Sequence, residues 1–227
     1  MADTDGLTEE LYRAAGDARK EAAAEGPDFA RFMGLYHDND GTPNLKHVPV
    51  YVDALDDPHT LGVTEITYNG IKDTMQAAVV GLNTSIGKLK GYFGRAKRVA
   101  KHEFDHVLSA ALATYDDMRN HWSNQLMESI PTYARAQFER SRGNHELATT
   151  ILEEENPYPL ARAIGEVADR EYVGPDGSRG YHALIGDVQR EASMYGPLKR
   201  LLRKAGEKIT TLANKYAAQR SALPAAA

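Results

Sequence analysis

Residues 71–130 have the sequence IKDTMQAAVVGLNTSIGKLKGYFGRAKRVAKHEFDHVLSAALATYDDMRNHWSNQLMESI and carry the strongest apolar stripe of the chain. In the first half, apolar residues recur at alternating spacings of four and three: Met75, Val79, Leu82, Ile86, Leu89, Phe93, Ala96 and Ala100. Such heptad-like spacing is typical of a coiled-coil seam, in which one side of a helix packs against another helix. The segment therefore predicts one long central helix, which Pro131 ends.

Four glycines interrupt this helical pattern, at Gly81, Gly87, Gly91 and Gly94. Inside a helix each glycine costs about 1 kcal/mol relative to alanine. Two explanations are open at this point. Either a second helix approaches closely at the glycines, or the helix has a break or hinge near residues 91–94.

The flanking sequence predicts shorter helices and one extended region. The last helix repeats the near-heptad register with Leu198, Leu201, Ala205, Ile209, Leu212 and Tyr216. Valines alternate with other residues over 48–52, and residues 63–68 offer a partner strand, so a small β-hairpin is allowed near residues 48–68. The predicted fold class is all-α, an elongated helical bundle around one long central helix. Residues 1–70 would form acidic helices and the hairpin region, and residues 71–227 the helical bundle.

The composition favours a soluble protein without a secretion signal. The chain has 227 residues, of which 42% are hydrophobic and 26% charged, with no apolar run long enough to span a bilayer. The first residues are acidic and lack the apolar core of a signal peptide, so synthesis in the cytoplasm is expected. The chain has no cysteine, which excludes disulfides and thiolate metal sites.

The chain has a net charge of −5, but its charges are unevenly distributed: the N-terminal region is acidic, and two later segments are basic. The first segment holds Lys88, Lys90, Arg95, Lys97, Arg98 and Lys101, and the second begins with Lys199, Arg200, Arg203 and Lys204. Three explanations fit this distribution: solvated helix faces, pairing with acids of the same chain, or contact with an anionic partner. The partners considered are nucleic acid and an anionic membrane surface, although a pI of about 5.9 is low for a dedicated nucleic-acid binder.

One motif points to catalysis, the sequence His102-Glu103-Phe104-Asp105-His106. On a helix, the two histidines of an H-E-x-x-H pattern can bind zinc while the glutamate deprotonates the metal-bound water. Over these five residues the chain resembles zinc-dependent peptidases. That resemblance implies that His102 and His106 bind zinc and that Glu103 is the general base. Candidate third ligands are His121, Glu128 and Glu139.

The resemblance does not extend to a known subgroup. Asp105 is charged where thermolysin-like peptidases have an apolar residue, and Leu112 stands where metzincins have a third histidine. Peptide deformylases share the His-Glu-x-Asp-His pattern, but their companion motif contains a cysteine, which this chain lacks. In the alternative interpretation, Glu103 forms an ion pair and the two histidines lie on a polar helix face.

The strong seams and the lack of a complete catalytic motif favour a non-enzymatic, helical structural or interaction protein. It is expected to self-associate or to bind an assembly partner, as a subunit of a larger assembly of the virion or secretion type. No cofactor is expected in this interpretation. The alternative function is a zinc-dependent metallopeptidase, and the third is a nucleic-acid-binding assembly protein that uses its basic helices.

Overall fold

The computed structural model describes residues 4–34, 44–57, 59–69, 74–110, 121–154 and 158–222, and these form two compact units. Unit 1 comprises residues 1–27, 42–108 and 225–227, and unit 2 comprises residues 28–41 and 109–224. Helix α1 (Thr4–Phe32) contributes to both. Among the described residues, no helix has the length and apolar character needed to cross a membrane.

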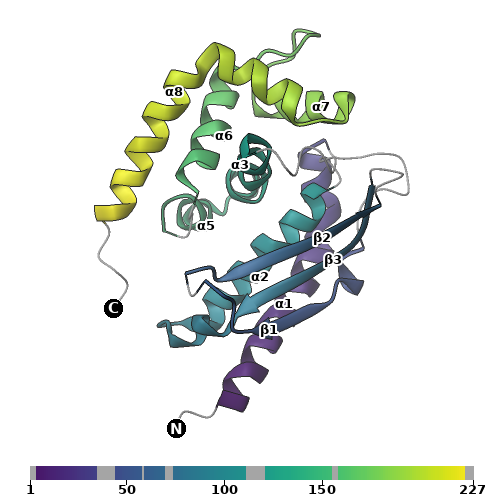
Figure 1. Ribbon diagram of the computed structural model, residues 1–227, viewed down its shortest axis with the longest axis vertical. Coiled ribbons are helices and arrows are strands. Elements are labelled where there is room, and N and C mark those ends of the chain that lie inside the picture. The colour runs from purple at the N-terminus through teal and green to yellow at the C-terminus, as the bar shows by residue number, and fades with distance from the viewer. Residues whose placement is uncertain are drawn as a thin grey trace. The chain divides into compact units, whose positions relative to one another are not determined.

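The all-α prediction is wrong, because unit 1 contains a three-stranded mixed sheet (Figure 1). Its strands are β1 (Val50–Asp53), β2 (Gly62–Asn69) and β3 (Thr74–Asn83), in the order β1-β3-β2. Strand β1 runs parallel to β3, and β2 runs antiparallel to β3. The predicted hairpin near residues 48–68 is therefore also wrong, since β3 lies between the two strands that it would have joined.

The single long central helix over residues 71–130 is wrong for the same reason. The segment begins with β3 and continues with a 3₁₀ helix, η2 (Thr84–Lys88), and helices α2 (Tyr92–Ser109) and α3 (His121–Ser129). Within β3 the buried side chains alternate at Ala78, Val80 and Leu82, which is the period of a strand. Gly91 adopts a positive φ of 68° directly before α2, so the break that glycine permits does occur there.

Helices α1 and α2 cover one face of this sheet (Figure 1). Small side chains are among the fully buried residues of both helices: Ala14, Ala15, Ala18 and Ala22 of α1 and Ala96 and Ala100 of α2. Val80, Leu82 and Phe104 complete the core between sheet and helices. This burial supplies the main stabilisation of unit 1, at roughly 25 cal/mol for each Å² of apolar surface removed from water.

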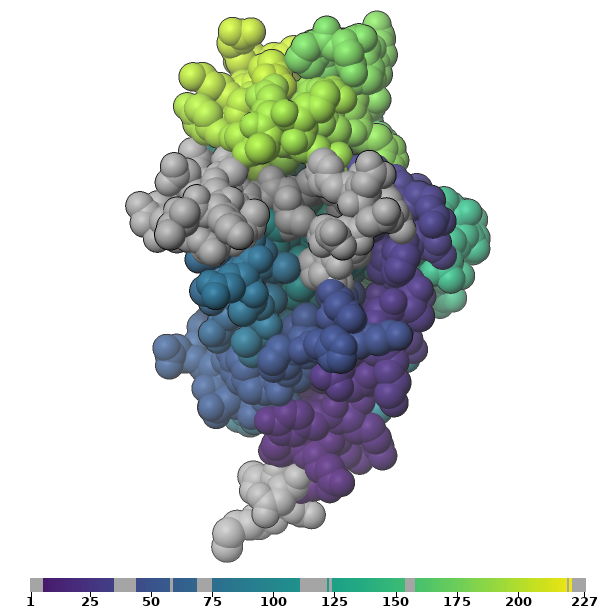
Figure 2. All heavy atoms as spheres, turned by 90° about the vertical axis from the view of Figure 1, so that its right-hand side faces the viewer, coloured from purple at the N-terminus to yellow at the C-terminus, as the bar shows by residue number. Residues whose placement is uncertain are grey.

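The other face of the sheet carries a cross-strand contact over Gly81. A Cβ atom at Gly81 would collide with the ring of Tyr51, so only glycine leaves room for that ring. The Tyr51 hydroxyl, on β1, donates a hydrogen bond of 2.6 Å to Glu65 on β2, and this bond raises the pKa of Tyr51 to about 12. Figure 2 shows strand residues, in blue, at the surface beside α1, in purple.

Unit 2 is helical in its described residues. After α3 follow the π-helical turn η5 (Ile130–Ala134), α4 (Arg135–Ser141), α5 (His145–Thr149), η6 (Thr150–Glu154), α6 (Pro159–Glu171), α7 (Tyr181–Glu191) and α8 (Tyr195–Ala222). Pro131 does not end the helical region as predicted, because η5 accommodates the residue that lacks an amide hydrogen.

Helix α8 packs its apolar seam against α6 within unit 2. Leu198, Leu201 and Ile209 of this seam are almost fully buried. Near its C-terminal end the Tyr216 hydroxyl donates a 2.6 Å hydrogen bond to Glu166, and the Arg162 guanidinium lies 3.8 Å from the centre of the Tyr216 ring. The seam that the sequence offered for packing or oligomerisation is thus occupied by a helix of the same chain.

Candidate metal site and charged surfaces

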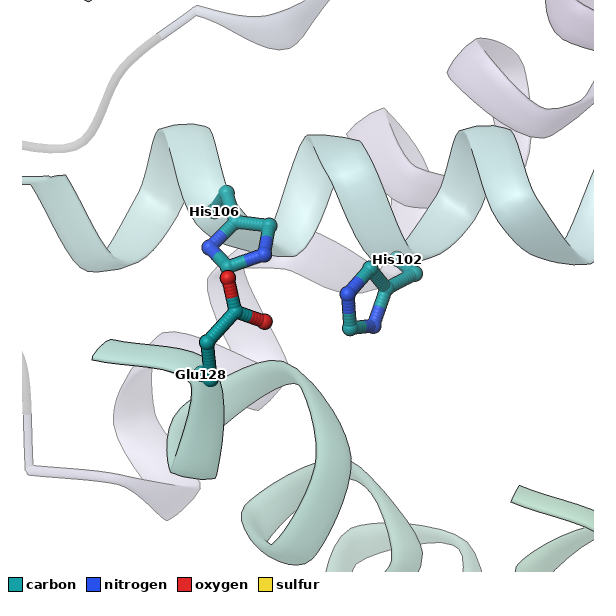
Figure 3. Close-up of side chains that lie close together, drawn as sticks. All are labelled: His102, His106 and Glu128. Atoms are coloured by element: carbon teal, nitrogen blue, oxygen red, sulfur yellow. The ribbon is translucent and has the colours of Figure 1, made fainter. Parts of the chain in front are cut away.

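His102 and His106 project from the same side of α2, one helical turn apart (Figure 3). Their ring centroids are 4.8 Å apart, with the ring planes perpendicular. His106 is 8% exposed, and His102 is half-buried. The spacing of the two imidazoles is therefore compatible with a shared metal ion, as the motif predicts.

Glu103 is positioned by β2. The Thr64 hydroxyl lies 2.7 Å from Oε2 of Glu103 and 2.9 Å from its backbone oxygen, and can donate to either acceptor. A Cβ atom at Gly62 would meet the Glu103 side chain at 2.8 Å, so the strand backbone approaches this carboxylate closely. Glu103 is 6% exposed. This glutamate consequently serves as a hydrogen-bond acceptor between helix and sheet, whereas a peptidase would need it at the metal-bound water.

The third ligand is not supplied by unit 1. All three candidates, His121, Glu128 and Glu139, belong to unit 2, where α3 carries the first two and α4 the last. Glu128 is the third residue labelled in Figure 3. Among the described residues of unit 1, no further histidine or carboxylate forms a ligand group with His102 and His106.

The first basic segment is partly neutralised by α1. Lys97 forms an ion pair of 2.5 Å with Glu21, and Lys101 one of 2.6 Å with Glu25. The side chains of the second pair are 17% and 25% exposed, so solvent screens that pair only in part. Of the three explanations for the charge distribution, pairing within the chain therefore applies to these two lysines.

The remaining cations of this segment are more accessible. Lys88, Lys90 and Arg98 are exposed, and Arg95 is half-buried. Lys88 and Lys90 lie between β3 and α2, on the N-terminal side of Gly91. They are the residues of this segment that an anionic partner could reach.

The second basic segment is also largely engaged in unit 2. Arg200 pairs with Glu191 at 2.5 Å and donates to the Tyr172 hydroxyl at 3.2 Å. Lys204 donates to the backbone oxygen of Glu171 at 2.8 Å, and Lys199 lies 5.4 Å from the centre of the Tyr195 ring. Arg203 is exposed. Two of these four predicted anion-binding residues, Arg200 and Lys204, thus hold α8 to neighbouring elements, whereas the ring that Lys199 contacts belongs to α8 itself.

Sequence reasoning missed a buried charge cluster at Asp187. This aspartate is 1% exposed, accepts a 2.6 Å hydrogen bond from Tyr172, and pairs with Arg190 and Arg200. Burial and the bond to Asp187 raise the pKa of Tyr172 to about 12. No sequence signal marks the cluster, because its members come from α7, α8 and Tyr172, the residue that follows α6.

The sequence analysis also did not predict a second buried ion pair, which Arg135 forms with Glu139. Both side chains are at most 4% exposed, and their closest charged atoms are 3.7 Å apart. The guanidinium of Arg135 lies 3.9 Å from the centre of the Phe29 ring, and Asn144 donates to Glu139 at 2.7 Å. Glu139, one of the proposed zinc ligands, is therefore bound to groups of its own unit.

Comparison with protein-family models, curated protein sequences and solved structures found no match for this chain.

Proposed function

We propose that this protein is a non-enzymatic structural and interaction protein that self-associates as a subunit of a larger assembly, of the virion or secretion type. The observation that supports it most is the mixed sheet of unit 1, which ends at β2, an eight-residue strand. In the described residues β2 pairs with another strand on one side only. A strand edge of this length is a template on which another chain can add a strand.

The role of Glu103 favours this proposal over a zinc-dependent metallopeptidase. A general base must reach the metal-bound water, but Glu103 holds Thr64 of β2 through the bonds described above. The specific observation in favour of the zinc alternative is the paired geometry of His102 and His106 on α2. The third function, nucleic-acid binding, rests on the exposed Lys88 and Lys90.

The test measures zinc content and oligomeric mass on the same purified sample, by elemental analysis and light scattering. The variant His102→Ala/His106→Ala removes the paired histidines. The matched control, His59→Ala/His145→Ala, removes two exposed histidines that lie apart from α2. We expect a defined oligomer without stoichiometric zinc, and an unchanged mass in both variants.

One zinc ion per chain, lost in the α2 variant and retained in the control, would overturn the proposal in favour of the peptidase. Incubating the wild-type protein with a chelator gives the same comparison without any substitution. A chain that shows only a monomer mass would contradict self-association.

A further inference from the structure

Helix α8 is divided into two parts at Ala205. This residue has φ −139° and ψ 19°, which are not helical dihedrals, so the helix is kinked there. Residues 195–204 form the first part, α8a, and residues 206–222 form the second part, α8b. Helix stability is cooperative only along an unbroken run of helical residues. The kink therefore separates two segments that can open independently of one another.

The part before the kink, α8a, is firmly held in unit 2. Leu198 and Leu201 are 2% and 1% exposed. Arg200 forms an ion pair of 2.5 Å with Glu191 and one of 3.4 Å with Asp187, which is itself buried. Both acids belong to α7. Opening α8a would expose two leucines and leave a buried aspartate without one of its cationic partners, which costs a large free energy.

The part after the kink, α8b, is longer but has fewer buried side chains. Among its described residues only Ile209 and Tyr216 are buried. The Tyr216 hydroxyl donates a 2.6 Å hydrogen bond to Glu166, and both partners of the 2.7 Å ion pair between Lys208 and Glu171 are accessible to solvent, which weakens that pair. Both acids lie on α6, which runs beside α8b (Figure 1). A helix with few buried contacts opens at a lower free energy than the core around it.

We infer that α8b is a strap that opens as one unit about Ala205, while α8a and α6 keep their native packing. Opening breaks the contacts of Lys208 and Tyr216 with α6 and leaves the ion pairs of Arg200 in place. It exposes the side chains of Ile209 and Tyr216, together with the side of α6 that α8b covers. Unit 2 thus has an apolar surface that is accessible only in the open state. Strap opening does not depend on self-association, because all of these contacts lie within unit 2.

The first test compares the accessibility of two buried positions, one on each side of the kink. Since the chain has no cysteine, Ile209→Cys and Leu201→Cys each introduce a single thiol, at positions that are at most 1% exposed. Each thiol reacts with an aromatic disulfide reagent under native conditions, and its rate is divided by the rate in the urea-unfolded variant. We expect the thiol at residue 209 to react at least about 10-fold faster than the thiol at residue 201, because only the first becomes accessible when the strap opens.

Low concentrations of urea separate strap opening from global unfolding. Opening of α8b alone exposes little surface, so the reaction rate at residue 209 should depend only weakly on urea, whereas the rate at residue 201 should rise steeply. Equal normalised rates at the two positions, or the same steep dependence on urea, would overturn the opening of α8b as a separate unit.

The second test measures hydrogen exchange of backbone amides, under conditions in which exchange follows the opening equilibrium. Leu198→Ala truncates a buried side chain of α8a and should accelerate exchange in α8a by at least about 30-fold. Exchange in α8b should not change, because Leu198 stays packed when the strap opens. Tyr216→Phe should accelerate exchange in α8b by about 5- to 10-fold, because the hydrogen bond to Glu166 is lost.

Tyr12→Phe is the matched control for Tyr216→Phe. It also removes a hydroxyl that takes part in a hydrogen bond, but in unit 1, where the Tyr12 hydroxyl accepts from the amide of Val52. This variant should leave exchange in α8b unchanged. If Leu198→Ala accelerates exchange in α8a and α8b by the same factor, α8 opens as one helix and the strap is ruled out.

Discussion

At the scale of the residue, a single hydrogen bond gives Glu103 a structural role that its sequence motif does not predict. In the sequence it is the second residue of an H-E-x-x-H pattern, but in unit 1 it is buried and accepts a hydrogen bond from Thr64. A buried carboxylate that loses its donor costs more free energy than the bond itself contributes, because the carboxylate remains removed from water. The glutamate is thus a structural link between α2 and β2.

This role predicts the effect of Thr64→Val, which keeps the shape of the side chain and removes the hydroxyl. We expect the free energy of unfolding to fall by about 1–3 kcal/mol, since the Glu103 carboxylate loses a hydrogen bond in a buried site. Urea unfolding measures the change. Thr67→Val, at an exposed position of the same strand, is the control and should change stability by less than about 0.5 kcal/mol. Equal losses in the two variants would contradict the structural role of the bond.

At the scale of the element, helix α8 uses its apolar seam within the chain. The near-heptad pattern of Leu198, Leu201 and Ile209 is present in the sequence, and these side chains are buried in unit 2. A periodic apolar stripe indicates that one side of a helix is buried, but it does not identify the element that covers it. Here the partner is α6 of the same unit.

Ile209→Ala tests this assignment. Ile209 is fully buried, so the truncation should lower the free energy of unfolding by about 2–5 kcal/mol through lost burial and the cavity that remains. The oligomeric mass of the folded protein should not change. Thr210→Ala, on the exposed side of the same helix, is the control. A changed mass with unaltered stability would instead identify the seam as an interface between chains.

At the scale of the whole molecule, buried tyrosines make stability depend on alkaline pH. Burial is the main cause of the raised pKa of Tyr133, Tyr172, Tyr181 and Tyr216, and the pKa reaches about 12 for Tyr172 and Tyr216. In the unfolded chain a tyrosine ionises near pH 10. Below that pH these groups are neutral in both states, and the native protein keeps its full stability.

Above about pH 10 the unfolded state ionises first, so the free energy of unfolding should decrease as the pH rises toward about 12. Urea unfolding at a series of pH values measures this slope. Tyr172→Phe should make the slope shallower, because one of the buried phenols is absent. Tyr195→Phe, at a residue that is 51% exposed, should leave it unchanged. Identical slopes in all three proteins would show that Tyr172 titrates in the same way in both states.

The sequence by itself determined several local features. The alternating valines predicted a strand over residues 48–52, where β1 lies, and residues 63–68 were its predicted partner, where β2 lies. The apolar period predicted helices over ranges that overlap Tyr92–Ser109 and Tyr195–Ala222, and a break near residues 91–94 was one of the two explanations for the glycines. These features follow from side-chain period and from glycine geometry, which act over a few neighbouring residues. The spacing of His102 and His106 was likewise fixed as soon as α2 formed a helix.

Only the tertiary structure decided the rest. Residues 77–82, AAVVGL, fit a helical and a strand period equally well, and pairing with β1 and β2 on either side selected the strand. Glu103 became a structural acceptor because β2 placed Thr64 beside it, and Lys97 and Lys101 became partners of α1 because the two helices pack together. Each of these outcomes depends on residues far apart in the chain. Local sequence preference cannot encode them, because their free energy arises only when the distant partner is in place.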